Sequence, residues 1–290
     1  LPMKVLITGA AGQVGRALAD SSPPAAQLTG MSHQRLDVGD VAAVASCVQE
    51  LRPDIIINAA AYTAVDRAEA EANLARRINT EGARNIATAA RDVGARLIHI
   101  STDFVFGGNS STPYRPDSPT GPLNVYGLTK RDGEDAVRKV LPDASVVLRT
   151  AWVYSAVGSN FVKTMLRIMR ATGSVRVVAD QIGTPTAARS VADAIWALTA
   201  RPQVAGVHHW TDAGVASWYD FAVAVAEEAA QLRLVSPSVT VIPIPTSQYP
   251  TPALRPKFSV LDTSSLAEIR TNAIHWRMRL RGVLGEMRDG

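Results

Sequence analysis

The chain has 290 residues, of which 47% are hydrophobic, so it can bury a full core as one large domain or two unequal ones. Its formal net charge of +4 is mild, and its single cysteine, Cys47, excludes an internal disulfide framework. No apolar run reaches the ~18 residues that a membrane span needs. The N-terminus enters a strand pattern directly, without a signal peptide, so we expect a cytoplasmic protein.

Basic side chains gather only at Arg277, Arg279 and Arg281. We interpret them as the end of a helix, where the dipole favours cations, because no nucleic-acid-binding motif accompanies them. Neither nucleic acid nor membrane is expected as a partner.

Short β-branched runs alternate with alanine-rich stretches from Lys4 to about Thr150. This alternation predicts an α/β fold, a doubly wound parallel sheet of the Rossmann type with right-handed crossovers. The expected strands are 5–8, 28–31, 55–58, 96–101 and 146–150, and the expected helices are 14–19, 41–51, 72–93 and 125–140.

The first expected strand leads into TGAAGQVG at 8–15, a GxxGxxG spacing that opens a helix. Glycine at positions 9, 12 and 15 permits a tight turn and close backbone approach, so that a pyrophosphate can bind the free amides of the helix. A glycine-rich turn by chance is the alternative, but the position between strand and helix favours a dinucleotide site. The glycines of this expected site are Gly9, Gly12 and Gly15.

The second expected strand ends in MSHQR at 31–35, without the acid that binds the 2′-hydroxyl of NAD. Ser32, His33 and Arg35 can donate hydrogen bonds or charge to a 2′-phosphate, which favours NADPH. NADH remains the alternative cofactor, and a solvated loop is the plainer interpretation. Asp37, followed by Val38, is placed to accept a hydrogen bond from an adenine amino group.

Polar side chains end the fourth expected strand, which runs into STDF at 101–104. Ligands of this fold bind at the carboxyl ends of the strands, so Thr102 can hydrogen-bond a substrate oxygen and Asp103 a sugar hydroxyl. Serine, threonine and aspartate are also ordinary turn formers.

Tyr126 and Lys130 are the only tyrosine and lysine at this four-residue spacing, which places them on one helix face. A nearby positive charge is expected to lower the pKa of the phenol towards neutrality, so that Tyr126 can act as a proton donor. An exposed helical pair is the alternative.

After residue 150, prolines mark loops at Pro185, at Pro243 and Pro245, and between 250 and 256. We expect residues 1–150 to form an NAD(P)-binding Rossmann domain. Residues 151–290 are expected to form mainly a smaller mixed substrate lobe, with some segments returning to the first domain and the ligand between the lobes.

These features together resemble the extended short-chain dehydrogenases and, more closely, the dTDP-4-dehydrorhamnose reductases. The similarity covers nearly the whole chain, in blocks that include NAAAYTAVD at 58–66, STD at 101–103, NVYGLTK at 124–130 and RTAWVY at 149–154. It continues in the second lobe through NF at 160–161, DQIGTPT at 180–186 and YPTPALRP at 249–256.

The resemblance implies reduction of the 4-keto group of dTDP-6-deoxy-L-lyxo-4-hexulose to dTDP-L-rhamnose, the last step of dTDP-rhamnose synthesis. The partner is then a dTDP-linked 4-keto-6-deoxy sugar. Tyr126 would protonate the oxyanion, Lys130 would tune Tyr126 and bind the ribose, and Thr102 would hydrogen-bond the same oxygen. The implied cofactor site is lined by Gly12, Gln13, Val14, Asp37, Val38, Ala59, Ala60, Ala61 and Thr63. The implied sugar pocket is lined by Val65, Asp103, Phe104 and Trp152, with Arg255 as a pyrophosphate clamp.

The chain departs from this family at a few positions. Phe104 and Gly107 stand where relatives often have tyrosine and aspartate. Ala17 and Arg189 stand where glutamates of some relatives hold a dimer-bridging magnesium ion, so we expect no metal, activity that survives chelation, and either a monomer or a homodimer. The rival functions are another nucleotide-sugar 4-ketoreductase and a non-catalytic protein like the regulatory subunit of methionine adenosyltransferase. A dehydratase is disfavoured because Phe104, not glutamate, follows the Thr-Asp pair.

Overall fold

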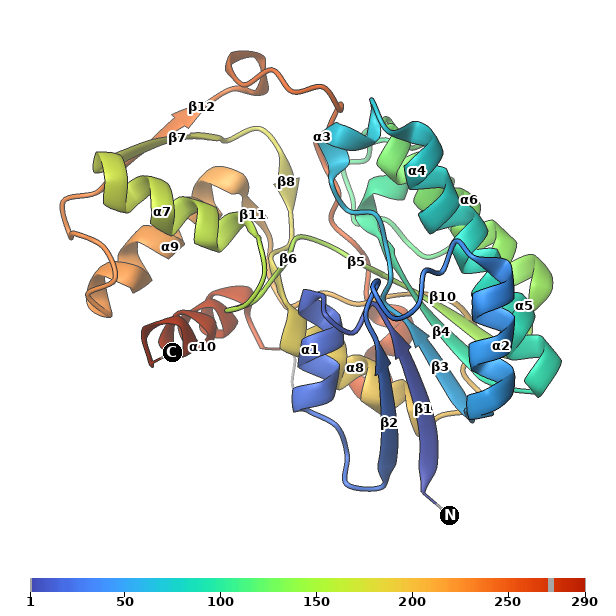
Figure 1. Ribbon diagram of the computed structural model, residues 1–290. Helices are drawn as coiled ribbons and strands as arrows, with labels where there is room; N and C mark the ends of the chain where they lie inside the picture. The colour runs from blue at the N-terminus through green and yellow to red at the C-terminus, as the bar shows by residue number, and fades with distance from the viewer. Residues whose placement is uncertain (1, 271–273, 290) are drawn as a thin grey trace.

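The chain folds into two lobes of unequal size in the computed structural model, which describes residues 2–270 and 274–289 (Figure 1). Within these ranges every helix is too short to cross a bilayer. The helices are α1 (Gln13–Asp20), α2 (Val41–Leu51), α3 (Val65–Ala68), α4 (Ala72–Arg76), α5 (Gly82–Val93), α6 (Val125–Val140), α7 (Phe161–Thr172), α8 (Ala188–Thr199), α9 (Trp218–Gln231) and α10 (Trp276–Asp289). The strands are β1 (Met3–Thr8), β2 (Ala26–Met31), β3 (Ile55–Asn58), β4 (Arg96–Thr102), β5 (Ser145–Thr150), β6 (Val153–Tyr154), β7 (Ser174–Val178), β8 (Ile182–Gly183), β9 (Thr186–Ala187), β10 (Gly206–His209), β11 (Ala216–Ser217) and β12 (Thr240–Ile244).

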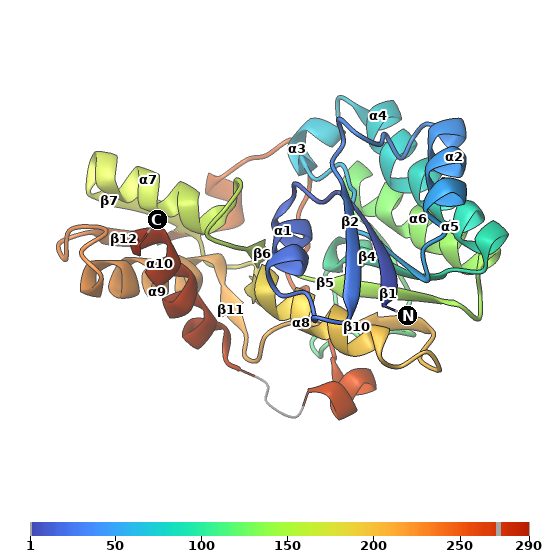
Figure 2. The same ribbon diagram turned by 60° about the horizontal axis from the view of Figure 1, so that its bottom comes forward.

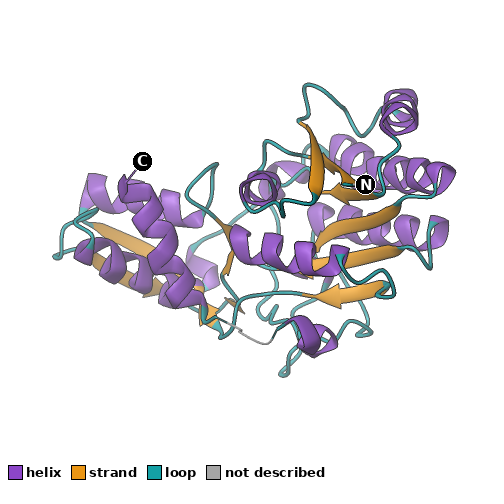
Figure 3. Cartoon of the chain, turned by 90° about the horizontal axis from the view of Figure 1, so that it is seen from below, coloured by secondary structure: helices purple, strands orange, loops and turns teal. Residues whose placement is uncertain are grey.

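The larger lobe is built on a six-stranded parallel sheet in the order β10-β5-β4-β3-β1-β2. Successive side chains of its strands point to opposite faces, so Leu6 packs towards α2, α5 and α6 while Ile7 packs towards α1 and α8. Figure 3 shows helices on both faces of this sheet. The predicted doubly wound fold is confirmed, and its switch point lies between β1 and β3, where the strand order reverses.

Two segments from beyond residue 150 complete the larger lobe. β10 extends the sheet beside β5, with Val207 opposite Val147. α8 packs against α1, and the Trp196 indole N–H donates to Ser21 Oγ at 3.2 Å. Figure 2 shows α1 and α8 next to each other on the same side of the sheet.

The smaller lobe packs α7, α9 and α10 around a core that includes Tyr154, Phe221 and Leu280. Its strands form three two-stranded sheets, β12-β7, β11-β8 and β6-β9. From β12 the chain crosses back towards α3 in the larger lobe, as the orange segment in Figure 1 shows. This crossing brings residues 251–255 to the carboxyl edge of the central sheet.

The predicted helix at 72–93 is interrupted. Arg77–Glu81 form a π-helical turn between α4 and α5. Asn79 in this turn donates to Thr129 Oγ1 on α6 at 3.1 Å, and Thr80 donates to the Thr129 carbonyl at 2.9 Å. The change from α-helix to π-helix thus occurs where the chain contacts α6, and the local sequence cannot indicate such contacts.

Two further expectations were wrong. Pro243 lies inside β12 rather than in a loop, which a two-stranded sheet tolerates because every strand in it is an edge strand. Arg277 and Arg281 lie in the first two turns of α10, not near its end, and they pair with Glu228 on α9 at 3.0 and 2.8 Å. The positive charges of these arginines are therefore balanced by Glu228 rather than by the dipole at the end of a helix.

Candidate active site

The turn between β1 and α1 brings the backbone close to β3. Gly9 has a φ of +69°, and a Cβ on it would lie 2.6 Å from the Ala59 carbonyl carbon. Gly12 occupies the N-cap of α1. Because it has no side chain, the first backbone amides of α1 receive no capping hydrogen bond from it. A helix N-terminus in this state attracts a phosphate group.

A cavity of about 370 Å³ opens beside this turn. Seven residues predicted to hold the cofactor line it, together with His33 at the end of β2. Gln13 faces the smaller lobe instead, because its Oε1 accepts from Ser155 Oγ at 3.0 Å and from Asn160 Nδ2 at 2.9 Å. The predicted residues that line the cavity are Gly9, Gly12, Val38, Ala59, Ala60, Ala61 and Thr63.

Asp37 is already engaged within the chain. Its carboxylate accepts from the Gly39 amide at 2.9 Å and pairs with Arg77. Burial raises the pKa of Asp37, but the hydrogen bonds from Gly39 and Arg77 outweigh it, so this pKa lies below its usual value. Arg35 is exposed and donates to the Gly30 carbonyl at 3.1 Å, which leaves its charge at the end of β2.

Thr102 and Tyr126 meet where β4 ends and α6 begins. Thr102 Oγ1 accepts from the Phe104 amide at 3.1 Å, and the Phe104 ring contacts the Tyr126 ring edge-on, with centroids 5.6 Å apart. Asn124 caps α6 by accepting from the Gly127 amide at 2.8 Å. The start of α6 therefore fixes the phenol against the strand end.

The pKa of Tyr126 differs from the sequence expectation. Burial raises it to about 12, against a hydrogen bond with Thr102 that lowers it. The Lys130 Nζ donates a hydrogen bond to the Ile100 carbonyl at 2.6 Å. Tyr126 is therefore protonated at neutral pH, as a proton donor must be.

Lys130 is 2% exposed, which rules out an exposed helical pair. Burial lowers its pKa to about 8, while the charge of Glu134 acts in the opposite direction. Lys130 thus carries a positive charge at neutral pH. Asp103 is also buried, and burial raises its pKa to about 6.

A second cavity, of about 340 Å³, lies in the smaller lobe. Arg255 lines it, and its guanidinium pairs with Asp66 of α3 through hydrogen bonds of 3.0 and 2.8 Å. Trp152 has a φ of +48° and stacks on Trp218, with ring centroids 3.5 Å apart. Trp218 also lines the cavity, and sequence reasoning missed it because its neighbours form only an ordinary helix start.

Val65 begins α3, next to Asp66, at the edge that faces the crossing segment. Among the described residues, no group of three or more histidine, cysteine, aspartate or glutamate side chains is arranged to hold a metal ion. Ala17 lies on α1 and Arg189 on α8, where Arg189 pairs with Asp193 at 2.7 Å.

Comparisons with known proteins agree with this architecture. A sequence model of the family described as the RmlD substrate binding domain matches residues 3–289. A dTDP-4-dehydrorhamnose reductase of Streptomyces griseus is 44% identical over 281 residues, which cover 95% of this chain and 91% of the relative. A probable dTDP-4,6-dihydroxy-2-methyloxan-3-one 4-ketoreductase of Streptomyces antibioticus is 43% identical over 289 residues, which cover 96% of this chain and 94% of the relative. The crystal structure of a Bacillus anthracis dTDP-4-dehydrorhamnose reductase in complex with NADP aligns with a TM-score of 0.92 and 36% identity, covering 99% of this chain and 100% of that one.

Proposed function

Because this chain belongs to the RmlD substrate-binding-domain family, we propose that it is an NADPH-dependent reductase of a dTDP-linked 4-keto-6-deoxy sugar. The substrate is dTDP-6-deoxy-L-lyxo-4-hexulose and the product is dTDP-L-rhamnose, as for the enzymes named dTDP-4-dehydrorhamnose reductase. The observation that carries this proposal is the meeting of Thr102 with a half-buried, protonated Tyr126, one helical turn before the buried Lys130.

Reduction of a ketone needs a hydride, a proton and stabilisation of the negative charge that develops on the oxygen. The hydride comes from the nicotinamide of bound NADPH. Tyr126 donates its phenolic proton to the oxygen at C4, and the Thr102 hydroxyl donates a hydrogen bond to the same oxygen. The charge of Lys130 stabilises the phenolate that remains, and the phenolate is then reprotonated from water.

The residues around the glycine turn fit a dinucleotide. The close approach of Gly9 to Ala59 leaves no room for a side chain, and the uncapped start of α1 suits a pyrophosphate. We assign cofactor binding to residues 1–150 and substrate binding mainly to residues 151–290, with Asp103, Phe104, Trp152 and Arg255 towards the sugar diphosphate.

A turnover assay tests the proposal. Purified protein receives dTDP-6-deoxy-L-lyxo-4-hexulose and NADPH, NADPH oxidation is followed, and the product is identified by NMR. We expect dTDP-L-rhamnose, and we expect Tyr126→Phe to lower turnover by about 10²- to 10⁴-fold while NADPH still binds. Near-normal turnover of this variant would contradict the mechanism.

A second candidate is a ketoreductase for a differently substituted dTDP sugar, because the Streptomyces antibioticus relative is nearly as similar as the reductase from Streptomyces griseus. A panel of dTDP-linked 4-keto sugars in the same assay separates the two by their kcat/KM values. A regulatory binding protein would turn over none of them.

A further inference from the structure

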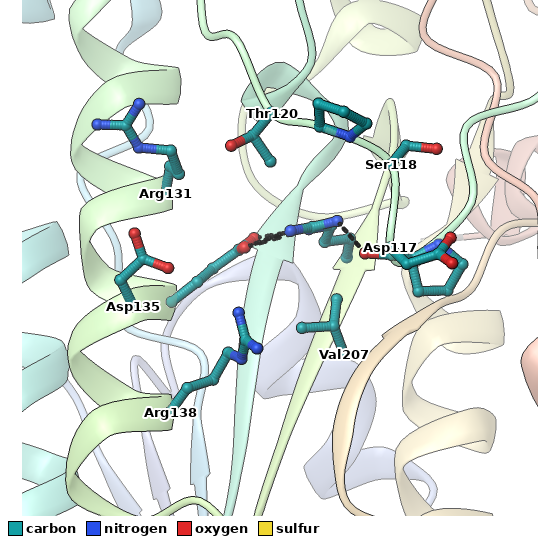
Figure 4. Close-up of a pocket in the computed structure, with 11 residues that line it drawn as sticks. Asp117, Ser118, Thr120, Arg131, Asp135, Arg138 and Val207 are labelled. Carbon is teal, nitrogen blue, oxygen red and sulfur yellow. Dashed lines mark hydrogen bonds and ion pairs between the residues drawn. The ribbon is translucent and has the colours of Figure 1, made fainter.

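Many polar contacts of the larger lobe stay within that lobe. Figure 4 shows the surroundings of a cavity of about 550 Å³ beside α6, with Arg131 on the helix and Thr120 across from it. The ion pair of Glu134 with Arg149, at 2.6 Å, also lines this cavity, and the residues around it all belong to the larger lobe. Contacts of this kind stabilise one lobe, but they do not fix its position relative to the other.

Gln13 makes a contact of a different kind, because its side chain bonds across the two lobes. It is the first residue of α1, which Figure 1 shows on the side of the larger lobe that faces the smaller one. Its Oε1 lies 2.9 Å from Asn160 Nδ2 and 3.0 Å from Ser155 Oγ, both in the loop that joins β6 to α7. A Cβ on Gly158 of the same loop would lie 3.2 Å from Gln13 Cγ. Both the amide and the aliphatic part of Gln13 therefore face this loop.

The hydrogen bonds of Asn160 determine which atom of Gln13 takes part. Asn160 Oδ1 accepts from the Lys163 amide at 3.1 Å and thereby caps α7, so its Nδ2 group is directed to the loop and to Gln13. This group has two hydrogen atoms, which it donates to the Ser155 carbonyl at 2.8 Å and to Gln13 Oε1. The Ser155 hydroxyl has a single hydrogen atom and also lies 2.8 Å from the Val157 carbonyl oxygen. The bond from Asn160 to Gln13 is thus the one that does not depend on where that hydrogen atom lies.

The two ends of this bond lie at the two cavities. Gln13 directly follows Gly12, which lines the cavity beside the glycine turn. Asn160 directly precedes Phe161, and this residue and three others of α7 line the second cavity together with Arg255. A displacement of the start of α7 relative to the start of α1 would therefore change the distance between the two cavities.

We propose that Gln13 is a positioning residue that, through Asn160, holds the smaller lobe at the distance that hydride transfer requires. The inference rests on the proposed function for its catalytic meaning, because NADPH is assigned to the larger lobe and the nucleotide sugar mainly to the smaller one. Reacting atoms must lie about 3–3.5 Å apart, and a misplacement of about 1 Å costs about 10²-fold in rate. Gln13 acts on the reaction only through the placement of the lobes.

Two single substitutions remove the bond from opposite sides. Gln13→Met keeps the length of the side chain but has no amide oxygen to accept from Asn160. Asn160→Ser keeps the cap of α7, since serine caps helices about as well as asparagine, but its shorter side chain cannot reach Gln13. Each variant should lower kcat about tenfold, the factor that corresponds to one lost neutral hydrogen bond, and leave the KM for NADPH within about twofold.

The double variant tests whether the two residues act through the same bond. Q13M/N160S should be no slower than either single variant, because the second substitution removes nothing that the first has left. A loss of about a hundredfold, the product of the two single effects, would show that Gln13 and Asn160 act independently and would overturn the proposal.

Gln13→Glu is the conservative rescue. A carboxylate oxygen can accept from Asn160 as the amide oxygen does, so most of the kcat lost in Gln13→Met should return. Its charge at the start of α1 repels a pyrophosphate, so the KM for NADPH should rise several-fold. If Gln13→Met instead raises the KM for NADPH and leaves kcat unchanged, Gln13 binds the cofactor and the proposal is overturned.

The placement of the lobes can be measured without turnover. Spin labels at the exposed positions Glu50→Cys on α2 and Arg167→Cys on α7, in a Cys47→Ser background, report the distance between the lobes by double electron–electron resonance. We expect one narrow distance distribution in this background. After Gln13→Met or Asn160→Ser the distribution should broaden or shift, because the lobes lose the bond that joins them.

Gln248→Met is the matched control. Gln248 Oε1 accepts from Arg176, and both residues belong to the smaller lobe, so the distribution should stay narrow; an equal broadening here would overturn the proposal. Absent turnover of the unsubstituted protein, together with a broadened distribution in Gln13→Met, would refute the proposed function and support the placement of the lobes by Gln13. Normal turnover with unchanged kcat and unchanged distances in both bridge variants would refute the role of Gln13 alone.

Discussion

Gly127 is the position at which one methyl group should disturb catalysis most directly. A Cβ there would overlap the Phe104 carbonyl oxygen and lie 3.0 Å from both the Phe104 carbonyl carbon and Pro122 Cβ. Carbon atoms normally approach to about 3.5 Å, so these contacts require a shift of about half an ångström, and the overlap with the oxygen requires more. The neighbours are backbone and a proline ring, which cannot move aside as a flexible side chain would.

We therefore expect Gly127→Ala to displace the first turn of α6, and Tyr126 with it, away from the end of β4. A misplacement of about 1 Å in a catalytic group costs about 10²-fold in rate, so kcat should fall by about that factor. Overpacking should also reduce the free energy of unfolding by about 1–3 kcal/mol. The assays are steady-state turnover of the 4-keto sugar and denaturant unfolding.

Gly285→Ala on α10 makes the same chemical change where, apart from the adjacent helix backbone, no atom lies within 4 Å of the new methyl group. Alanine favours helix over glycine by about 1 kcal/mol, so this control should be more stable than the unsubstituted protein and equally active. If Gly127→Ala retains full kcat, the close approach of α6 to Phe104 does not position Tyr126, and the reasoning is refuted.

Three other predictions concern single charges. Because burial raises the pKa of Asp103 to about 6, ionisation of this carboxyl group destabilises the folded protein. The destabilisation is absent below about pH 4 and complete above about pH 6. In thermal scans, the Tm of Asp103→Asn should therefore rise relative to that of the unsubstituted protein between these pH values and keep a constant advantage above them. Asp66→Asn should raise the KM for the nucleotide sugar about tenfold and leave the KM for NADPH unchanged, because it loosens the guanidinium of Arg255; an equal effect on both would show a general structural fault. Arg35→Ala should weaken NADPH binding in a fluorescence titration but not NADH binding, and a parallel loss of both would contradict recognition of a 2′-phosphate.

The sequence was sufficient for the strands and helices whose causes are local. The glycine spacing at 9–15 and the β-branched strands each act through neighbouring residues, and these elements appear where the patterns predict them. The π-helical turn depends instead on Asn79 meeting Thr129, 50 residues further along the chain. No local pattern reports such a contact.

The candidate site divides in the same way. Tyr126 and Lys130 share one helix, so their spacing predicts their proximity. The pKa of Tyr126 was expected to fall but is raised, because burial depends on the packing of Phe104 and the strand end rather than on the spacing to Lys130. The pairing of Arg255 with Asp66 spans 189 residues and required the structure.

The return of α8 and β10 to the larger lobe restricts how this protein can be recombined with its relatives. A chimera joined once at residue 150 would combine the first five strands of one parent with the sixth strand of the other, and would pair α1 of one parent with α8 of the other. Both foreign contacts lie in packed layers, β10 on β5 and Trp196 against the end of α1. A graft that transfers sugar specificity should therefore exchange 151–187 and 210–258 as separate inserts and keep 188–209 from the parent that supplies the sheet.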